Sequence, residues 1–191
     1  MKRLLIVLFA ATTFFGTAQN GLHFDGVDDH IQTTYIGISG SAARTVEAWI
    51  KTSATAISNQ QVITDWGSMS TGTRFTMNLL WSNSIRLEAG GNGLSGTTPV
   101  NDGNWHHVAV VYDPLATNTI SLYIDGALEI AGNLTVTINT ASSVALKIGE
   151  RIDGINNFEG IIDEVRVWDI ARSSTDIAND HNVKFCSSRP N

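Results

Sequence analysis

Three acidic residues near the start of the chain have the types and spacing that suit metal binding. Asp25, Asp28 and Asp29 flank Gly26 and Val27. Calcium takes several hard oxygen ligands, and a glycine-containing loop with spaced carboxylates can wrap around such an ion. The same residues also suit a solvated turn, in which Asp and Gly serve the backbone geometry alone. Composition leaves both interpretations open.

Asp163 is a further carboxylate that calls for a partner. Alternate residues of a strand point to opposite faces, so Asp163 is predicted to share a face with Ile161 and Val165. An isolated charge on an apolar face is very costly to bury. This carboxylate is therefore expected to be ion-paired, hydrogen-bonded or bound to a metal ion.

Polar side chains that alternate with apolar ones along two strands are candidate sugar ligands. Arg74 and Asn78 fall opposite the apolar residues of one strand, and Arg86 and Glu88 fall opposite those of the next. Such groups on neighbouring strands could hydrogen-bond the hydroxyls of a sugar. They would equally suit an ordinary solvated sheet face.

The tryptophans divide into one candidate ligand and several candidate core residues. Trp66, between an aspartate and a glycine, is interpreted as a loop aromatic able to stack on a sugar ring. The alternative is that Trp66 packs beneath a loop. Trp49 and Trp105 are assigned to the core, and Trp81 shares the apolar phase of its strand.

A residue period of two dominates the chain and predicts strands rather than helices. The expected strands cover residues 22–24, 31–33, 44–51, 62–65, 74–80, 85–89, 105–112, 120–124, 128–130, 144–148 and 161–168. Asp125 and Gly126 form the strongest hairpin signal. A short helix is expected after Ser173, because Ser173 and Asp176 form a capping box. Many short strands with almost no helix predict a sandwich or a barrel.

The first residues predict a secretory signal peptide over residues 1–18. Lys2 and Arg3 precede an apolar run, and small residues lead to a cleavage point after Ala18. The run is too short to span a bilayer core of about 30 Å as a helix. Export to the outside of the cell or to its surface is therefore expected.

Charge excludes two classes of partner. The chain carries 12 Lys and Arg against 18 Asp and Glu, and loss of the leader removes two of the basic residues. This acidic balance argues against nucleic acid and against insertion into or binding to anionic membranes.

Cys186 is the single cysteine, so a disulfide within the domain is excluded. It is left open whether Cys186 pairs with another chain, stays free, or indicates that the natural protein continues.

Several ordered segments together resemble a known family. They are residues 22–31, 45–51, 102–113, with its Trp105-His106-His107 motif, 122–126, 148–149 and 158–168. This series is similar to the laminin G-like jelly-roll domains of the concanavalin A-like lectin/glucanase superfamily. The resemblance runs from about residue 21 to residue 180. It implies a domain over residues 19–180, followed by a tail over residues 181–191.

The resemblance implies an all-β, two-sheet antiparallel jelly-roll sandwich with a short C-terminal helix. It also implies carbohydrate binding on a concave sheet or at rim loops, often with a structural calcium ion. In such a fold the first and last strands are neighbours, which would let Asp163 reach Asp25 and Asp28. Calcium bound by Asp25, Asp28 and Asp163 is therefore expected. Domains of this kind are commonly parts of larger extracellular proteins.

Catalysis is not expected. Laminarinase-type enzymes of the same superfamily place carboxylates at Glu-x-Asp-x-x-Glu spacing on one strand, because glycoside hydrolysis needs a carboxylate pair, and this motif is missing here. His106 and His107 point to opposite faces of a strand and cannot chelate one ion together.

Two main hypotheses remain: a secreted module that binds extracellular glycan, and a structural or adhesive domain that binds a cell-surface protein. A glycan-cleaving enzyme is the remote alternative.

Overall fold

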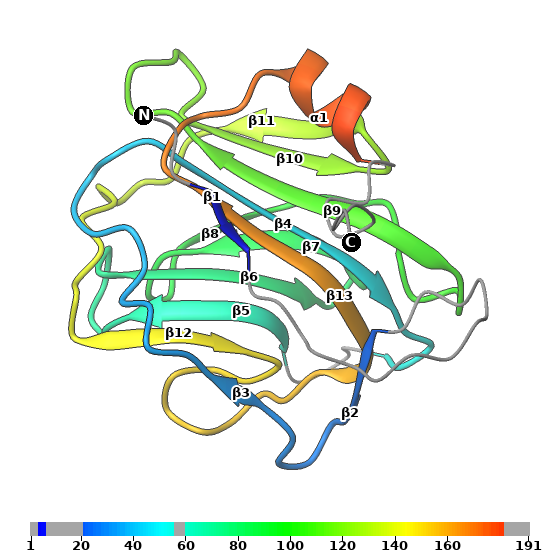
Figure 1. Ribbon diagram of the computed structural model, residues 1–191. Helices are drawn as coiled ribbons and strands as arrows, with labels where there is room; N and C mark the ends of the chain where they lie inside the picture. The colour runs from blue at the N-terminus through cyan, green and yellow to red at the C-terminus, as the bar shows by residue number, and fades with distance from the viewer. Residues whose placement is uncertain (1–3, 7–20, 56–59, 182–191) are drawn as a thin grey trace, which may run out of the picture.

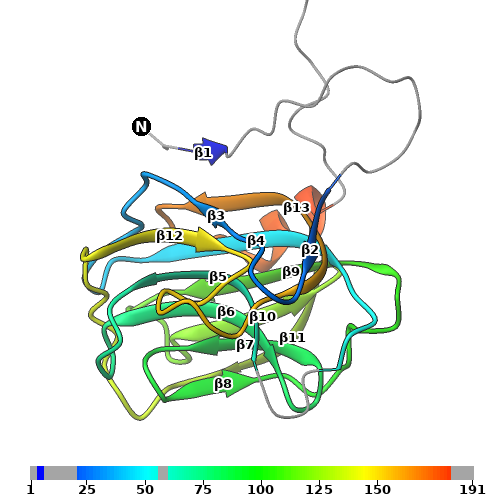
Figure 2. The same ribbon diagram turned by 90° about the horizontal axis from the view of Figure 1, so that it is seen from below.

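The computed structural model describes residues 4–6, 21–55 and 60–181. Two antiparallel sheets face each other as a sandwich (Figure 1), and their stacking is clearest from below (Figure 2). The predicted all-β, two-sheet jelly-roll sandwich with one short C-terminal helix is therefore confirmed.

One sheet has seven strands, in the order β1-β13-β4-β9-β10-β11, with β2 also paired to β13. These strands are β1 (Leu4–Ile6), β2 (Leu22–Asp25), β4 (Arg44–Lys51), β9 (Trp105–Tyr112), β10 (Ile120–Ile124), β11 (Ala127–Gly132) and β13 (Glu159–Trp168). The second sheet has six strands, in the order β3-β12-β5-β6-β7-β8. They are β3 (Ile31–Gln32), β5 (Gln61–Gly67), β6 (Arg74–Leu80), β7 (Ser84–Glu88), β8 (Gly93–Ser95) and β12 (Val144–Ile148).

Alternation along the strands builds the core between the sheets. Phe75 and Met77 of β6 and Ile85 and Leu87 of β7 point inward and are fully buried. Val110 of β9 meets them from the opposite sheet as part of the same cluster. Burial of apolar surface contributes about 25 cal/mol per Å², so this shared core is what holds the two sheets face to face.

Local signals read from the sequence recur in the structure. The turn between β10 and β11 has positive φ angles at both Asp125 (51°) and Gly126 (80°), as a tight hairpin turn requires. The helix α1 (Ser174–Asp180) begins after Ser173, which forms the expected capping box with Asp176. Ile177 is the buried residue of α1 and packs on the outer face of the seven-stranded sheet.

The sandwich has two ends that are useful as landmarks. In the pairing of β4 with β9, Arg44 lies opposite Tyr112 and Lys51 lies opposite Trp105. We call these the Arg44 end and the Lys51 end. Because β13 is antiparallel to β4 and pairs Ile161 with Lys51, the start of β13 lies at the Lys51 end.

The predicted leader and tail fall mostly outside the described residues. Within the leader, the structure describes only β1, which pairs with the end of β13 at the edge of the sheet. Cys186 and the tail after residue 181 also lie outside. The signal peptide and the domain boundaries at 18 and 180 therefore remain predictions. No helix in the described part of the chain is long and apolar enough to cross a membrane.

Candidate functional site

The acidic loop after β2 gathers three carboxylates at one point. Carboxylate oxygens of Asp25, Asp28 and Asp29 all lie within 4.8 Å of one another, and the three residues are exposed. The backbone N–H of Val27 donates to Oδ1 of Asp25 at 2.8 Å, and that of Asp28 donates to the same atom at 3.3 Å. The Val27 hydrogen bond is the main cause that lowers the pKa of Asp25. The loop therefore holds an oxygen-rich cluster of carboxylates.

Asp163 does not join this cluster, and the expected face assignment for it was wrong. A bulge in the pairing of β13 with β4 lies between Asp163 and Arg166, with Glu164 at a φ angle of 50°. The extra residue inverts the alternation, so that Ile162 and Val165 belong to the core while Asp163 does not. Oδ1 of Asp163 accepts a hydrogen bond from the backbone N–H of Glu164 at 2.8 Å. Among the described acidic residues, Asp29 takes the third place in the cluster instead.

The four polar residues proposed as sugar ligands lie together, but they are not exposed. Arg74 and Asn78 of β6 and Arg86 and Glu88 of β7 share the outer face of the six-stranded sheet, and all four are buried. The guanidinium groups of Arg74 and Arg86 both pair with the Glu88 carboxylate. Burial alone would raise the pKa of Glu88, but the two arginines lower it. We call this group the Glu88 cluster.

Loop residues cover the Glu88 cluster. The side chain of Gln60 donates to the Glu88 carboxylate and accepts from Nδ2 of Asn78 at 3.1 Å. On the same face, Asp65 accepts hydrogen bonds from Oγ1 of Thr76 at 2.6 Å and from the backbone N–H of Ile152 at 2.9 Å. Burial raises the pKa of Asp65 to about 7. The predicted open sugar-binding face is thus a closed polar layer in this structure.

A cleft of about 380 Å³ lies beside this layer at the Lys51 end. We call it the rim cleft. Its lining includes Val27, Gln60, Gln61, Asn156, Asn157 and Glu159. Four of these side chains are amides, which both donate and accept hydrogen bonds. Nδ2 of Asn157 is buried without a hydrogen-bond partner in the described part of the chain.

Gln60 and Val27 connect the rim cleft to its neighbours. Gln60 belongs to the cleft lining and also binds Glu88, so the Glu88 cluster fixes one wall of the cleft. Gly26 and Val27, from the acidic loop, form another part of the lining. Asp25 of β2 lies opposite Glu159 of β13 in the backbone pairing of these strands, which places the acidic loop directly beside the cleft.

Trp66 and Trp81 have exchanged the roles expected from the sequence. Trp66 lies within β5 and is fully buried, with its ring against Phe75 and its Nε1–H donating to the carbonyl of Ile38. The loop position was wrong, because β5 continues to Gly67. Trp81 follows the last residue of β6 and is 73% exposed, with a φ angle of 41°.

Trp81 lies at the same end of the sandwich as the rim cleft. Leu79, two residues before it, pairs with Gln61 of the cleft lining. A bulky residue with positive φ is uncommon and strained. The sequence offered one signal for this position: the serines and asparagine that follow Trp81 favour a turn rather than a continued strand.

The outer face of the seven-stranded sheet carries a second buried charge cluster, beneath α1. Glu47 of β4 accepts from Nη1 of Arg172 at 2.6 Å, and Nε2 of His107 lies 3.3 Å from its carboxylate. Arg166 of β13 approaches the same carboxylate at 3.6 Å. Burial alone would raise the pKa of Glu47, but hydrogen bonds to His107 and Arg172 lower it. We call this the Glu47 cluster, and His107 is a buried member of it.

Comparison with known proteins gives a family and several structural neighbours. Residues 25–178 match the family model of the concanavalin A-like lectin/glucanases superfamily that is named for laminin G. A search of curated proteins with the sequence found no match.

A crystal structure of a candidate carbohydrate-binding protein from Bacteroides ovatus superposes with a TM-score of 0.62 at 21% identity. That match covers 83% of this chain and 47% of the other, so this chain spans about half of that protein. The carbohydrate-binding module CBM40 of a Ruminococcus gnavus sialidase, solved with α2,3-sialyllactose, superposes at 0.59 with 14% identity, covering 83% of this chain and 100% of the module. Domain 4 of an extracellular arabinanase from Geobacillus stearothermophilus, with arabinotriose, superposes at 0.54 with 17% identity, covering 74% and 67%. These likenesses concern the fold.

Proposed function

Since the chain belongs to the concanavalin A-like lectin/glucanases superfamily, we propose that it is an exported carbohydrate-binding module that holds extracellular glycan at the rim cleft. Structural neighbours with this fold are mainly carbohydrate-binding modules. The leader-like first residues support action outside the cell.

One observation carries the proposal: the amide-lined rim cleft contains an unsatisfied buried donor, Nδ2 of Asn157. A buried polar group without a partner is costly, on the order of 1–3 kcal/mol. A hydroxyl of a bound sugar would relieve this cost. Gln61 and Asn156 offer further amide groups for neighbouring hydroxyls. Exposed Trp81 supplies an aromatic face at the same end, on which a sugar ring in a longer glycan could stack.

The lining of the rim cleft favours binding over cleavage. Among the described residues that line it, Glu159 is the single carboxylate. Hydrolysis of a glycosidic bond ordinarily uses two carboxyl groups that flank the bond, one as acid and one as base or nucleophile. We therefore propose a non-catalytic module. Release of reducing sugar from polysaccharides by the purified protein would overturn that part of the proposal.

Calcium at the acidic loop is part of the same proposal. Asp25, Asp28 and Asp29 offer the hard oxygen ligands that calcium prefers, and their oxygens converge within 4.8 Å. No lysine or arginine pairs with these three carboxylates in the described residues. A bound ion would hold the loop that carries Gly26 and Val27 into the rim cleft.

The calcium proposal is tested by thermal unfolding in calcium and in excess chelator. We expect calcium to raise the melting temperature of the wild type by a few degrees, since a ligand that binds only the folded state stabilises it. Asp28→Asn should remove most of this shift, whereas Asp163→Asn, outside the cluster, should retain it. Equal melting curves of the wild type with and without calcium would exclude the ion.

The glycan proposal is tested on a glycan array with and without calcium. We expect selective binding that Asn157→Ala or Gln61→Ala weakens about tenfold, as loss of one or two hydrogen bonds implies. Trp81→Ala should weaken binding of oligosaccharides, and Ile36→Ala, which removes another exposed apolar side chain, serves as its matched control. Binding that all of these variants retain would place the sugar elsewhere.

A protein-binding, adhesive domain is the second candidate. It is favoured by the exposure of apolar side chains at the Lys51 end: Val27 and Trp81 are each 73% exposed, and Ile155 is 50% exposed. Such residues can anchor a protein partner. A folded protein that binds no glycan on the array, yet loses adhesion to cell surfaces in the Trp81→Ala variant, would favour this candidate.

A further inference from the structure

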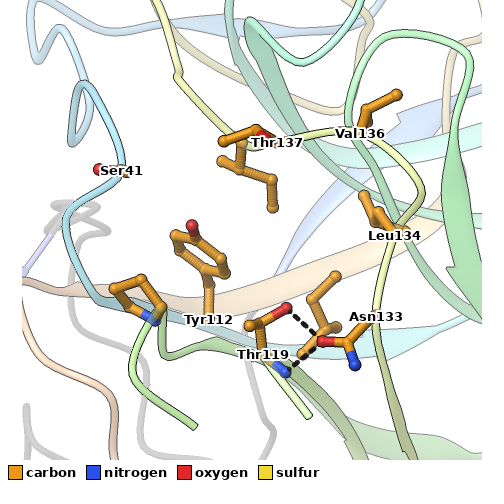
Figure 3. A pocket seen from close by; sticks show the side chains of 10 residues that line it. Ser41, Tyr112, Thr119, Asn133, Leu134, Val136 and Thr137 are labelled. Atoms are coloured by element: carbon orange, nitrogen blue, oxygen red, sulfur yellow. Dashed lines mark hydrogen bonds between the residues drawn. The ribbon is translucent and has the colours of Figure 1, made fainter. Parts of the chain in front are cut away.

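A second cleft, of about 460 Å³, lies at the opposite, Arg44 end of the sandwich. We call it the Tyr112 cleft. It is bounded by the loop before β4, the turn between β9 and β10, and the segment that follows β11 (Figure 3). Its volume lies within the range of about 300–1,000 Å³ that is typical of small-molecule sites. It shares no lining residue with the rim cleft.

The hydroxyl of Tyr112 is the feature that points to a ligand. Tyr112 is only 5% exposed, and its side chain rises into the open space between Ser41 and Thr137 (Figure 3). In the described part of the chain its hydroxyl has no hydrogen-bond partner. Most of the Tyr112 side chain is buried, but its hydroxyl oxygen reaches the open cleft, where it offers a donor and an acceptor.

The walls of the Tyr112 cleft are held by hydrogen bonds that do not involve Tyr112. Asn133 accepts at Oδ1 from both the backbone N–H and the hydroxyl of Thr119, each at 2.9 Å (Figure 3). Its Nδ2 donates to the carbonyl of Thr117 at 3.0 Å. These bonds tie the segment after β11 to the turn before β10, so this side of the cleft is built in advance of any ligand.

Arg44 fixes the opposite wall and leaves the cleft uncharged. Its guanidinium donates to the carbonyl of Gly40 at 2.8 Å and to Oγ1 of Thr140 at 3.0 Å, which holds the loop that carries Ser41. The rings of Phe75 and Tyr112 cover it, with centroids 5.1 and 5.6 Å away. Because ring and carbonyl groups enclose this cation, it does not line the cleft.

The chemistry of the lining identifies a class of ligand. None of the described lining residues carries a charge, so a phosphorylated or carboxylated ligand would find no counter-ion there. Hydroxyls of Ser41, Tyr112 and Thr137 line the cleft together with apolar Leu134 and Val136. A pyranose ring offers the same two kinds of surface, with hydroxyls around its edge and C–H groups on its faces.

We propose that the Tyr112 cleft is a second binding site, for one neutral monosaccharide unit, with the Tyr112 hydroxyl bonded to a sugar hydroxyl. The site is independent of the acidic loop and therefore does not need calcium. With the rim cleft at the other end, the module would contact two glycan segments at once, which raises avidity where both are present.

The test is a titration of isotopically labelled protein with glucose, galactose, mannose and N-acetylglucosamine in turn, followed by amide NMR in excess chelator. We expect at least one sugar to give saturable shifts at Tyr112, Thr119 and Thr137. Tyr112→Phe keeps the ring and removes only the hydroxyl, and it should weaken that binding by roughly fivefold. Tyr123→Phe is the matched control, since Tyr123 is also 5% exposed but packs beneath α1, and it should bind as the wild type does.

The outcomes separate this site from the rim cleft. Shifts confined to Gln61, Asn156 and Asn157 would overturn the second site and leave the proposed function intact. Equal affinities of the wild type and a folded Tyr112→Phe protein would also overturn it. Shifts at the Tyr112 cleft that the chelator leaves unchanged would support it, whatever the rim cleft does.

Discussion

The Glu47 cluster and the Glu88 cluster are built alike and lie on opposite outer faces of the sandwich. In each, one buried glutamate receives two arginines. The carboxylate pKa is lowered in both, by hydrogen bonds from His107 and Arg172 at Glu47 and by Arg74 and Arg86 at Glu88. The covers differ. Over the Glu47 cluster lies the segment with Arg172 and α1. Over the Glu88 cluster lies Gln60, which also lines the rim cleft.

This difference separates a structural role from a positioning role. Arg172 joins Glu47 to the C-terminal helix through the Asp176 carbonyl, which Nη2 of Arg172 contacts at 3.2 Å. The Glu47 cluster therefore attaches the C-terminal helix to the sheet. Its residues line neither the rim cleft nor the Tyr112 cleft. The Glu88 cluster instead holds the side chain of Gln60 in place, and Gln60 forms part of the wall of the rim cleft. A change at Glu47 should alter stability alone, and a change at Glu88 should alter stability and ligand affinity together.

The largest expected effect is on the Glu47 side. Glu47→Gln leaves the arginines and His107 without their anion, and breaking a buried ion pair in this way costs about 3–5 kcal/mol. We expect a loss of that order in the free energy of unfolding, measured with denaturant. Asp153→Asn is the control, because the Arg151–Asp153 pair is more exposed, with Asp153 at 30%, and should change stability by less than about 1 kcal/mol. Similar losses of unfolding free energy in the two variants would contradict the structural role assigned to the Glu47 cluster.

A smaller loss of stability, joined to a loss of affinity, is expected on the Glu88 side. Glu88→Gln keeps the shape of the side chain but weakens its charged hydrogen bonds with Arg74 and Arg86, at a cost of about 2–3 kcal/mol. Released Gln60 should then loosen the wall of the rim cleft, so that glycan affinity falls. Glu47→Gln, assayed at a temperature where it is folded, should bind glycan normally. Loss of affinity in both variants would remove the distinction between the clusters.

The fold was largely predictable from the sequence, because its signals are local. Alternation of apolar and polar residues set the strands, Asp125 and Gly126 set a hairpin, and Ser173 with Asp176 set the helix start. Asp163 shows the limit of that reasoning. One extra residue in β13, with Glu164 in the left-handed region, inverts the alternation, and nothing in the residue types announces such a bulge.

The candidate site was less predictable, because exposure depends on what covers a face. Alternation correctly placed Arg74 and Glu88 on the outer face of neighbouring strands. It could not show that Gln60 and the backbone of Ile152, distant in the chain, would close over that face. Likewise Trp66 and Trp81 differ in exposure because β5 extends through Trp66 whereas β6 stops before Trp81. Asn157 became a candidate only once its buried amide was seen to lack a partner.

The smallest expected effect concerns pH, and it distinguishes the two faces by sign. Burial raises the pKa of Asp65, beside the Glu88 cluster, from 3.8 to about 7. Folded protein thus binds a proton there that unfolded protein releases, so this contribution to stability is complete below pH 3.8 and is lost as pH rises through 7. The lowered pKa of Glu47 has the opposite effect on stability, because its contribution is present at neutral pH and is lost only in acid.

Between pH 6 and 8 we expect the free energy of unfolding of the wild type to fall about 1 kcal/mol further than that of Asp65→Asn, measured by urea titration. His106, whose pKa is also raised, is present in both proteins and cancels in the difference. Parallel pH profiles would mean that Asp65 is already ionised at pH 6, and the outer face of the six-stranded sheet would then resemble the Glu47 side in its response to pH.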